Sequence, residues 1–231
     1  MSVQYSTAKA KVERDLDLEE ENFIQDEEML EYFNEALREA EAEVLAIYED
    51  YLLDSASQAV VIGTSKYDLP NGIYASKIRG VIYSNGSIIY EIKRIRSAHK
   101  FLDRALLRDA DPTDYYQYII VNNSTTGIQI ELSPAAKETS SSNVTVWFIR
   151  EVDEIVDDTD LVDKDIPESI NFIYAYVKAR CKQKENAGQM PPDAQAELEK
   201  QRSLMIETLT TMVPDDDNEV IKDLSFYNEI S

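Results

Sequence analysis

Apolar residues recur every three or four positions between Asp26 and Leu53, and this pattern constrains the fold more than any other feature. The spacing predicts one long helix with a single apolar stripe, while acidic residues occupy its other faces. A helix of about 27 residues is roughly 40 Å long. It cannot bury such a stripe alone, so it requires partners. The stripe consists of Met29, Phe33, Leu37, Ala40, Val44, Tyr48 and Leu52.

The middle of the chain, residues 56–150, is predicted to be rich in strands. Asn85 and Gly86 are typical of a β-hairpin turn, because both residues tolerate positive φ and strand-forming residues flank them. A short helix is expected over residues 97–109, where apolar residues follow helical spacing. Strands are expected over residues 58–63, 76–83, 87–92, 115–121, 127–132 and 143–150.

Two more helices are predicted near the C-terminus. Pro167 suits the first turn of one helix, whose apolar face continues to Cys181. The other helix is expected from Pro192 to Met212, with Pro214 beyond its end. The expected fold is therefore α+β: a long-helix bundle of the N-terminal helix and two C-terminal helices, with an inserted small, mostly antiparallel β-domain.

The expected domain boundaries follow from these patterns. The predicted parts are a flexible N-terminal arm (1–16), the helical bundle (17–55 and 165–213), the β-rich insertion (56–150), an acidic connector (151–164) and a C-terminal tail (214–231). The connector is too polar for a core segment by this interpretation. The tail carries Phe226 and Tyr227 among other apolar residues, so we expect it to dock on a partner.

Acidic residues far outnumber basic residues and concentrate toward the two ends. The 45 Asp and Glu against 23 Lys and Arg give a formal net charge of −22, which makes nucleic acid a poor ligand for the whole surface. Residues 1–55 carry a net charge of −13, residues 56–150 carry +3 and residues 151–231 carry −12. Such alternation suits complementary surfaces that meet in an assembly. Without a membrane-spanning run or secretory signal, we expect a cytoplasm-like location and no membrane contact.

Few residues follow a pattern typical of catalysis. The six glycines form no phosphate-binding motif, and neither His99 nor Cys181 lies in a recognisable nucleophile arrangement. We therefore expect no enzyme activity, no catalytic residues, no metal and no cofactor. The acidic run from Asp157 to Asp165 leaves one alternative open, a carboxylate- or metal-dependent hydrolase or nuclease, although it does not match an EF-hand loop.

A basic segment, residues 93–108, interrupts the acidic sequence. Its cations include Arg94, Arg96, Lys100 and Arg104, and they could contact phosphates, an acidic neighbouring subunit or only water. The neighbouring subunit is the favoured interpretation, because the chain itself supplies so many acids. A DNA-binding module that uses this segment is a further alternative.

The order of the features resembles a known family. The features are the long acidic first helix, Tyr67-Asp68-Leu69-Pro70 ahead of a strand, the hairpin through Asn85-Gly86, the strand Val144 to Arg150, the acidic stretch ending in Ile166-Pro167, the helix that begins Glu168-Ser169-Ile170, and the polar helix over 197–209. In this order the chain, from about residue 18 to 213, resembles the head-to-tail adaptor (connector, or neck) proteins of tailed bacteriophages.

The resemblance implies a structural virion protein without catalytic residues. Such adaptors form a homo-oligomeric ring, generally twelve-fold, in the virion neck after assembly in the host cytoplasm. The ring links the portal protein to tail or nozzle proteins and encloses the channel through which genome DNA passes, without specific binding, during ejection. We expect the oligomer or portal interface to include Met29, Phe33, Leu37, Arg94, Arg96, Lys100, Arg104, Phe226 and Tyr227.

Overall fold

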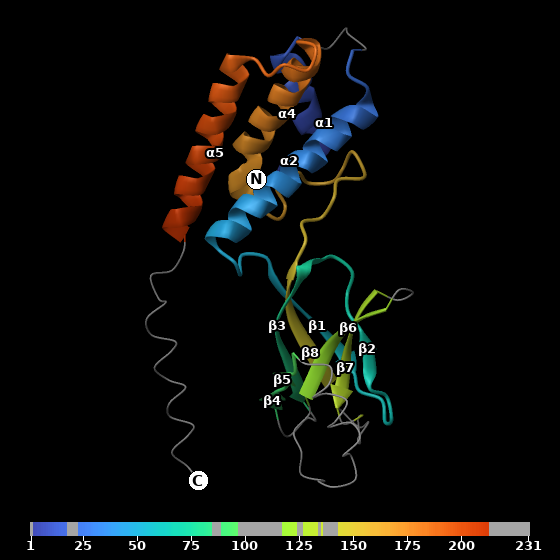
Figure 1. Cartoon of the computed structure of the whole chain (residues 1–231). Helices are drawn as coiled ribbons and strands as arrows, with labels where there is room; N and C mark the ends of the chain where they lie inside the picture. The colour runs from blue at the N-terminus through green and yellow to red at the C-terminus, as the bar shows by residue number, and fades with distance from the viewer. Residues whose placement is uncertain are drawn as a thin grey trace. The chain divides into compact units, whose positions relative to one another are not determined.

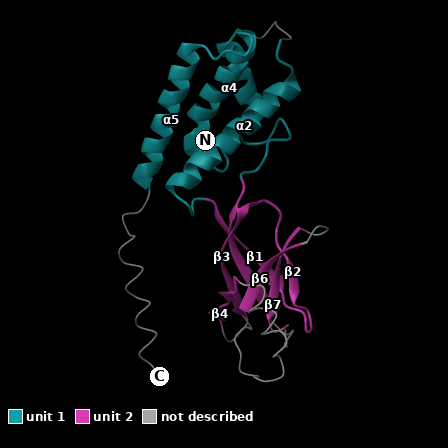
Figure 2. Cartoon of the chain, viewed as in Figure 1, with its two compact units in different colours: residues 1–51, 152–231 teal, residues 52–151 magenta. Residues whose placement is uncertain are grey.

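A computed structural model describes residues 2–17, 23–84, 89–96, 117–123, 127–133, 135 and 143–212. The chain divides into two compact units, shown in two colours in Figure 2. Unit 1 comprises residues 1–51 and 152–231, and unit 2 comprises residues 52–151. The described helices lie in unit 1 and the described strands in unit 2, so the predicted α+β class is confirmed.

Helix α4 is the central helix of unit 1, because it contacts the three other α-helices described there (Figure 1). It follows a single 3₁₀ turn, Pro167–Ser169, so the predicted helix start at Pro167 is confirmed. Helix α5 has the predicted bounds, Pro192–Met212. The helices are α1 (Tyr5–Asp15), α2 (Asp26–Ile47), α4 (Ile170–Glu185) and α5 (Pro192–Met212).

Helix α1 forms where the sequence predicted a flexible arm, so that prediction was wrong. Tyr5, Ala8 and Val12 are spaced by three and four residues and are buried. The ring of Tyr5 lies edge-on to the ring of Phe33 in α2, with centroids 5.3 Å apart. Three apolar positions give too weak a pattern to recognise in a polar segment, and packing against the other helices of unit 1 stabilises α1.

Helix α2 begins at Asp26 as predicted but ends at Ile47, before the predicted end at Leu53. Tyr48 is already in an extended conformation, with φ −129° and ψ 93°. Leu52 is buried, but it belongs to unit 2. The last two residues of the predicted stripe therefore do not continue the helix, and 22 residues correspond to a length of about 33 Å.

Cations near the C-terminal half of α4 connect it to its neighbours. Four successive alternate positions carry Lys or Arg, and each forms an ion pair with an acid of another helix. The pairs are Lys178–Asp15 with α1, Arg180–Glu35 and Lys184–Glu28 with α2, and Lys182–Asp193 with α5. Each pair is partly exposed and contributes little free energy alone. Together they place opposite charges at the contacts of α4 with α1, α2 and α5.

Two four-stranded sheets form from the described residues of unit 2. The first has the order β1-β8-β3-β4 and is antiparallel throughout. The second has the order β2-β7-β6-β5, in which only β5 pairs in parallel with its neighbour. The strands are β1 (Leu53–Ala59), β2 (Lys66–Asp68), β3 (Ile73–Ser84), β4 (Ile89–Glu91), β5 (Lys93–Arg94), β6 (Gln117–Asn123), β7 (Gly127–Ser133) and β8 (Asn143–Arg150).

One apolar core lies between the two sheets. The first sheet contributes Val81, Tyr83, Val144, Val146 and Phe148, which alternate along their strands with residues on the opposite face. The second sheet contributes the buried side chains Tyr67, Tyr118, Ile130 and Leu132.

Most of the predicted strands are present, with one displacement. Strands β3 and β4 pair antiparallel from Ser84 and Ile89 outward, which confirms the hairpin, although Asn85 and Gly86 lie outside the described residues. The strand predicted over 58–63 is instead β1, which ends at Ala59. The helix predicted over 97–109 also lies outside the described residues.

Candidate functional site: assembly surfaces

The acidic segment over residues 152–166 is part of the core of unit 1. Val152, Ile155, Val162 and Ile166 are buried in it, while the acids between them are mostly exposed. The expectation that this connector is too polar to contribute to a core was therefore wrong. The apolar residues are spaced irregularly, in keeping with a loop rather than a helix or strand, so no periodicity revealed them.

Side chains of α2 hold this segment by hydrogen bonds to its backbone. The Ile155 N–H donates to Oδ1 of Asn34 at 2.8 Å, and Nδ2 of Asn34 donates to the Ile155 carbonyl at 3.0 Å. The Val152 N–H donates to Oε1 of the buried Glu41 at 2.8 Å. These bonds satisfy backbone groups of a segment that has no regular secondary structure at these positions.

The aspartates of the segment accept backbone N–H groups. Oδ2 of Asp160 accepts from Val156 and Asp157, both at 2.8 Å, and these two bonds lower the pKa of Asp160. Oδ1 of Asp163 accepts from the Val3 N–H at 2.7 Å. These bonds give Asp160 and Asp163 a role in holding the backbone of the loop. Within the described ranges, no group of three or more His, Cys, Asp or Glu is placed to hold a metal ion.

The expected interface residues of α2 lie in the core. Met29, Phe33 and Leu37 are buried within unit 1, and Phe33 has no exposed surface. The stripe therefore packs against other helices of the same chain. This corrects the expectation that these three side chains are available to a neighbouring copy or a portal.

The described residues of the basic segment lie in unit 2. Arg94 ends β5, an edge strand of the second sheet, and Arg96 follows it; both are exposed. Four of the expected interface residues lie outside the described residues: Lys100, Arg104, Phe226 and Tyr227.

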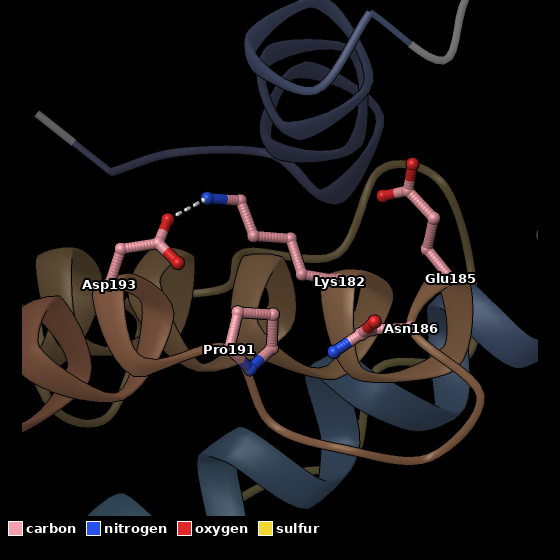
Figure 3. Close-up of a pocket in the computed structure, with 5 residues that line it drawn as sticks. All are labelled: Lys182, Glu185, Asn186, Pro191 and Asp193. Carbon is pink, nitrogen blue, oxygen red and sulfur yellow. Dashed lines mark hydrogen bonds and ion pairs between the residues drawn. The ribbon is translucent and has the colours of Figure 1, made fainter.

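A polar pocket of about 420 Å³ lies where α4 ends and α5 begins (Figure 3). Lys182 and Asp193 point toward each other in it and form an ion pair at 2.8 Å, while Glu185 lies on the other side. The remaining lining residues are Asn186 and Pro191. This lining has neither a nucleophile nor an unpaired cation, so we assign no chemistry to the pocket.

Cys181 lies in α4, and its side chain is buried within unit 1. Burial raises the pKa of its thiol to about 12, so the reactive thiolate is scarce near neutral pH. The interpretation of Cys181 as a core residue is consistent with this environment. His99 lies outside the described residues.

Unit 2 exposes large apolar side chains that the sequence analysis did not single out. Trp147, in the middle of β8, is 38% exposed, and Val61 and Ile62 between β1 and β2 are 54% and 57% exposed. For Trp147 a signal was present, because β8 alternates and Val144, Val146 and Phe148 take the inner face. Exposed apolar groups of this kind mark contact surfaces when they cluster.

An α+β chain that exposes large apolar side chains on both of its units has the features of a protein that assembles with other proteins. A model of the SU10 adaptor protein family matches residues 3–219, and the chain belongs to this family. The match confirms the resemblance to phage head-to-tail adaptors and makes the chain a structural component of a phage virion. A search of curated proteins found no match. None of the described helices has the length and apolar character that crossing a membrane requires.

Proposed function

We propose that copies of this chain form a closed ring, generally of twelve, that joins the phage portal to the tail and surrounds the DNA channel. The observation that carries the proposal is the family match over residues 3–219, which includes the whole of unit 2 and all described helices of unit 1. In this role the chain carries out no chemistry, needs no cofactor and works through contacts with itself, the portal and tail proteins.

The charge distribution supports an arrangement of this kind. Unit 2 contains 10 acids and 11 bases, so its net charge is +1. Because the net charge of the whole chain is −22, the net charge of unit 1 is −23. Acids of unit 1 that face the channel repel DNA phosphates, so the genome passes without binding. The acidic surface also repels sister copies, and contacts between copies must offset that repulsion.

The basic segment of unit 2 supplies one such contact in this proposal. Arg94 and Arg96 are exposed, and Lys100 and Arg104 continue the same basic run in the sequence. We propose that these cations meet acidic residues of a neighbouring copy, since opposite charges across an interface select partners and register. The tail beyond residue 213, with Phe226 and Tyr227, is proposed to contact the portal.

The proposal is tested by mixing the purified chain with the portal protein of the same phage. Mass photometry is expected to show one discrete complex, and cryo-EM a ring of adaptor copies on the portal. A chain truncated after residue 213 is expected to lose portal binding but to keep its melting temperature. The R94E variant is expected to weaken contacts between copies, whereas the matched single charge reversal K66E is not. A parent chain that forms no complex with the portal contradicts the proposal.

A further inference from the structure

Strand β1 is an edge strand of the first sheet, because it pairs with β8 on one side only. This pairing runs over seven residues without a register shift. Just before the strand, the Arg150 N–H donates to the Leu52 carbonyl at 3.0 Å, so every second residue counted from Leu52 directs its backbone groups to β8. The residues between them direct their backbone groups to the open edge. These residues are Leu53, Ser55, Ser57 and Ala59.

The pairing on the other side of β8 leads to the same alternation. The Ile92 N–H donates to the Val81 carbonyl at 2.7 Å, so the backbone groups of Val81 face β4 and those of Ile82 face β8. Thr145 lies opposite Ile82 and therefore directs its own backbone groups to β3. Ser57, which lies opposite Thr145 in β1, receives no backbone bond from β8. Its N–H and C=O face the open edge.

Much of this backbone row is unpaired. The Ser55 N–H donates to Oδ1 of Asp54 at 2.7 Å. Within the part of the chain that the structure describes, the N–H groups of Ser57 and Ala59 have no hydrogen-bond acceptor, and both residues are exposed. Alternating N–H and C=O groups along a strand edge are complementary to one kind of partner, the backbone of another extended segment.

The other edge strands that the structure describes are protected against such pairing. Strands β2 and β4 have three residues each and β5 has two. They carry the charged residues Lys66, Asp68, Glu91, Lys93 and Arg94. At the open edge of β2, the Asp68 carbonyl also accepts a hydrogen bond from Nε2 of Gln58.

Strand β1 lacks these protective features. It has seven residues, contains no Pro or Lys, has no bulge, and its one charged residue is Asp54. Proteins usually protect their sheet edges with short strands, charges, prolines or bulges. An unprotected edge of this length therefore indicates a place where another strand binds.

We propose that β1 binds an extended segment of the phage tail protein, which joins the first sheet as a fifth strand. This inference rests on the proposed adaptor function and specifies its contact on the tail side. A second copy of the chain is a poorer match, because the β1 edges of two copies meet only in a two-fold contact, which gives a dimer and not a ring. The remaining described edges are too short to pair with all of β1.

The tail protein is the partner that the proposed function leaves for this edge. In that proposal the segment beyond residue 213 contacts the portal, and the basic segment contacts a neighbouring copy. The side chains beside the open edge are small, and Oγ of Ser57 lies 2.6 Å from Oγ1 of Thr145. The edge is therefore open to an approaching backbone, and main-chain hydrogen bonds provide the recognition.

Residue-resolved hydrogen exchange tests the strand addition directly. In the portal-bound adaptor, the amides of Ser57 and Ala59 are expected to exchange rapidly, whereas those of Ala56 and Gln58, which face β8, are protected. Adding the purified tail protein of the same phage is expected to slow exchange at Ser57 and Ala59 about tenfold or more and to leave Ala56 and Gln58 nearly unchanged. A side-chain contact on the face of the sheet does not produce this alternation.

Proline at position 57 blocks the edge without removing a bond to β8, because the Ser57 N–H faces outward. S57P is expected to keep the parent's circular dichroism and to weaken binding of the tail protein about tenfold or more. The matched control S57A also loses the hydroxyl contact with Thr145 but keeps the N–H, and is expected to bind like the parent.

A second variant, A59K, keeps every backbone group and places a lysine on the edge. It is expected to weaken binding of the tail protein as well. N71K adds the same charge at another exposed position of unit 2 and is expected to bind like the parent.

The outcomes separate this inference from the proposed function. Tail-protein binding without slower exchange at Ser57 and Ala59, or folded S57P and A59K chains that both bind like the parent, overturns the strand addition and leaves the adaptor function standing. Slower exchange at these amides before the tail protein is added identifies a second copy or the portal as the occupant, and overturns the assignment to the tail protein. A parent chain that binds neither portal nor tail protein contradicts the proposed function, and the inference falls with it.

Discussion

Replacing Phe33 by Ala tests whether the α2 stripe is the core of one chain or an interface between chains. Phe33 is fully buried, and its ring lies 5.3 Å from that of Tyr5 in edge-to-face geometry. Truncating a buried Phe costs about 3–5 kcal/mol, and lost aromatic pairs account for about 0.5–1.5 kcal/mol of such effects. We expect F33A to lower the free energy of unfolding by about 4 kcal/mol in the unassembled chain.

The assay is urea denaturation of the dilute, unassembled protein, followed by far-ultraviolet circular dichroism for the helices of unit 1. The single Trp147 lies in unit 2, so its fluorescence follows that unit separately. F33L, which keeps most of the apolar volume, is expected to cost only about 1 kcal/mol. An F33A monomer that unfolds at the parent's urea concentration, while assembly is lost, would refute the reasoning and restore the interface interpretation.

Three further predictions concern unit 1. N34A removes both hydrogen bonds to Ile155 and is expected to cost about 1–3 kcal/mol in urea denaturation; an unchanged midpoint contradicts the role of Asn34. A hydrogen bond from Lys184 lowers the pKa of Glu28 below its ordinary value of 4.5, so its stabilising contribution is present above that pH and is lost as pH falls through the lower folded-state value. The stability difference between E28Q and the parent is therefore expected at neutral pH and to vanish in acid, and a pH-independent difference refutes this linkage. Cys181 is expected to resist alkylation in the folded chain at mildly alkaline pH and to react on denaturation, as mass spectrometry would show; rapid labelling of the folded chain contradicts its burial.

The sequence predicted those elements whose own residues indicate where they begin, turn or end. Helix α5 lies between Pro192 and Met212 because proline favours a first turn, and the hairpin of β3 and β4 surrounds a dipeptide with strong turn preference. The start of α2 at Asp26 follows from the acids in its first turn and the onset of the stripe.

Elements that depend on distant partners were not predictable in the same way. Helix α1 has few apolar residues and gains its stability from contacts such as Tyr5 with Phe33. Burial of Ile155 depends on Asn34, which is distant in the sequence. Periodicity extended the α2 stripe to Leu52, although the chain passes into unit 2 there. An apolar residue alone does not show which part of the structure covers it.

The candidate surfaces show the same difference between features with a local sequence signal and features that depend on distant residues. The sequence identified the α2 stripe as needing cover and predicted a bundle with the two C-terminal helices, but it also assigned Met29, Phe33 and Leu37 to an interface with other chains, and these residues are buried within unit 1. It identified the basic run, of which Arg94 and Arg96 are exposed. It gave no weight to Trp147, although β8 alternates and places this residue on the face opposite its buried neighbours.

A cryo-EM reconstruction of the chain bound to its portal examines the adaptor assignment most directly. The account predicts a closed ring of copies in which neighbours touch through the basic segment of unit 2. A portal that stays bare at saturating adaptor concentration, or that carries isolated copies without mutual contact, would contradict it.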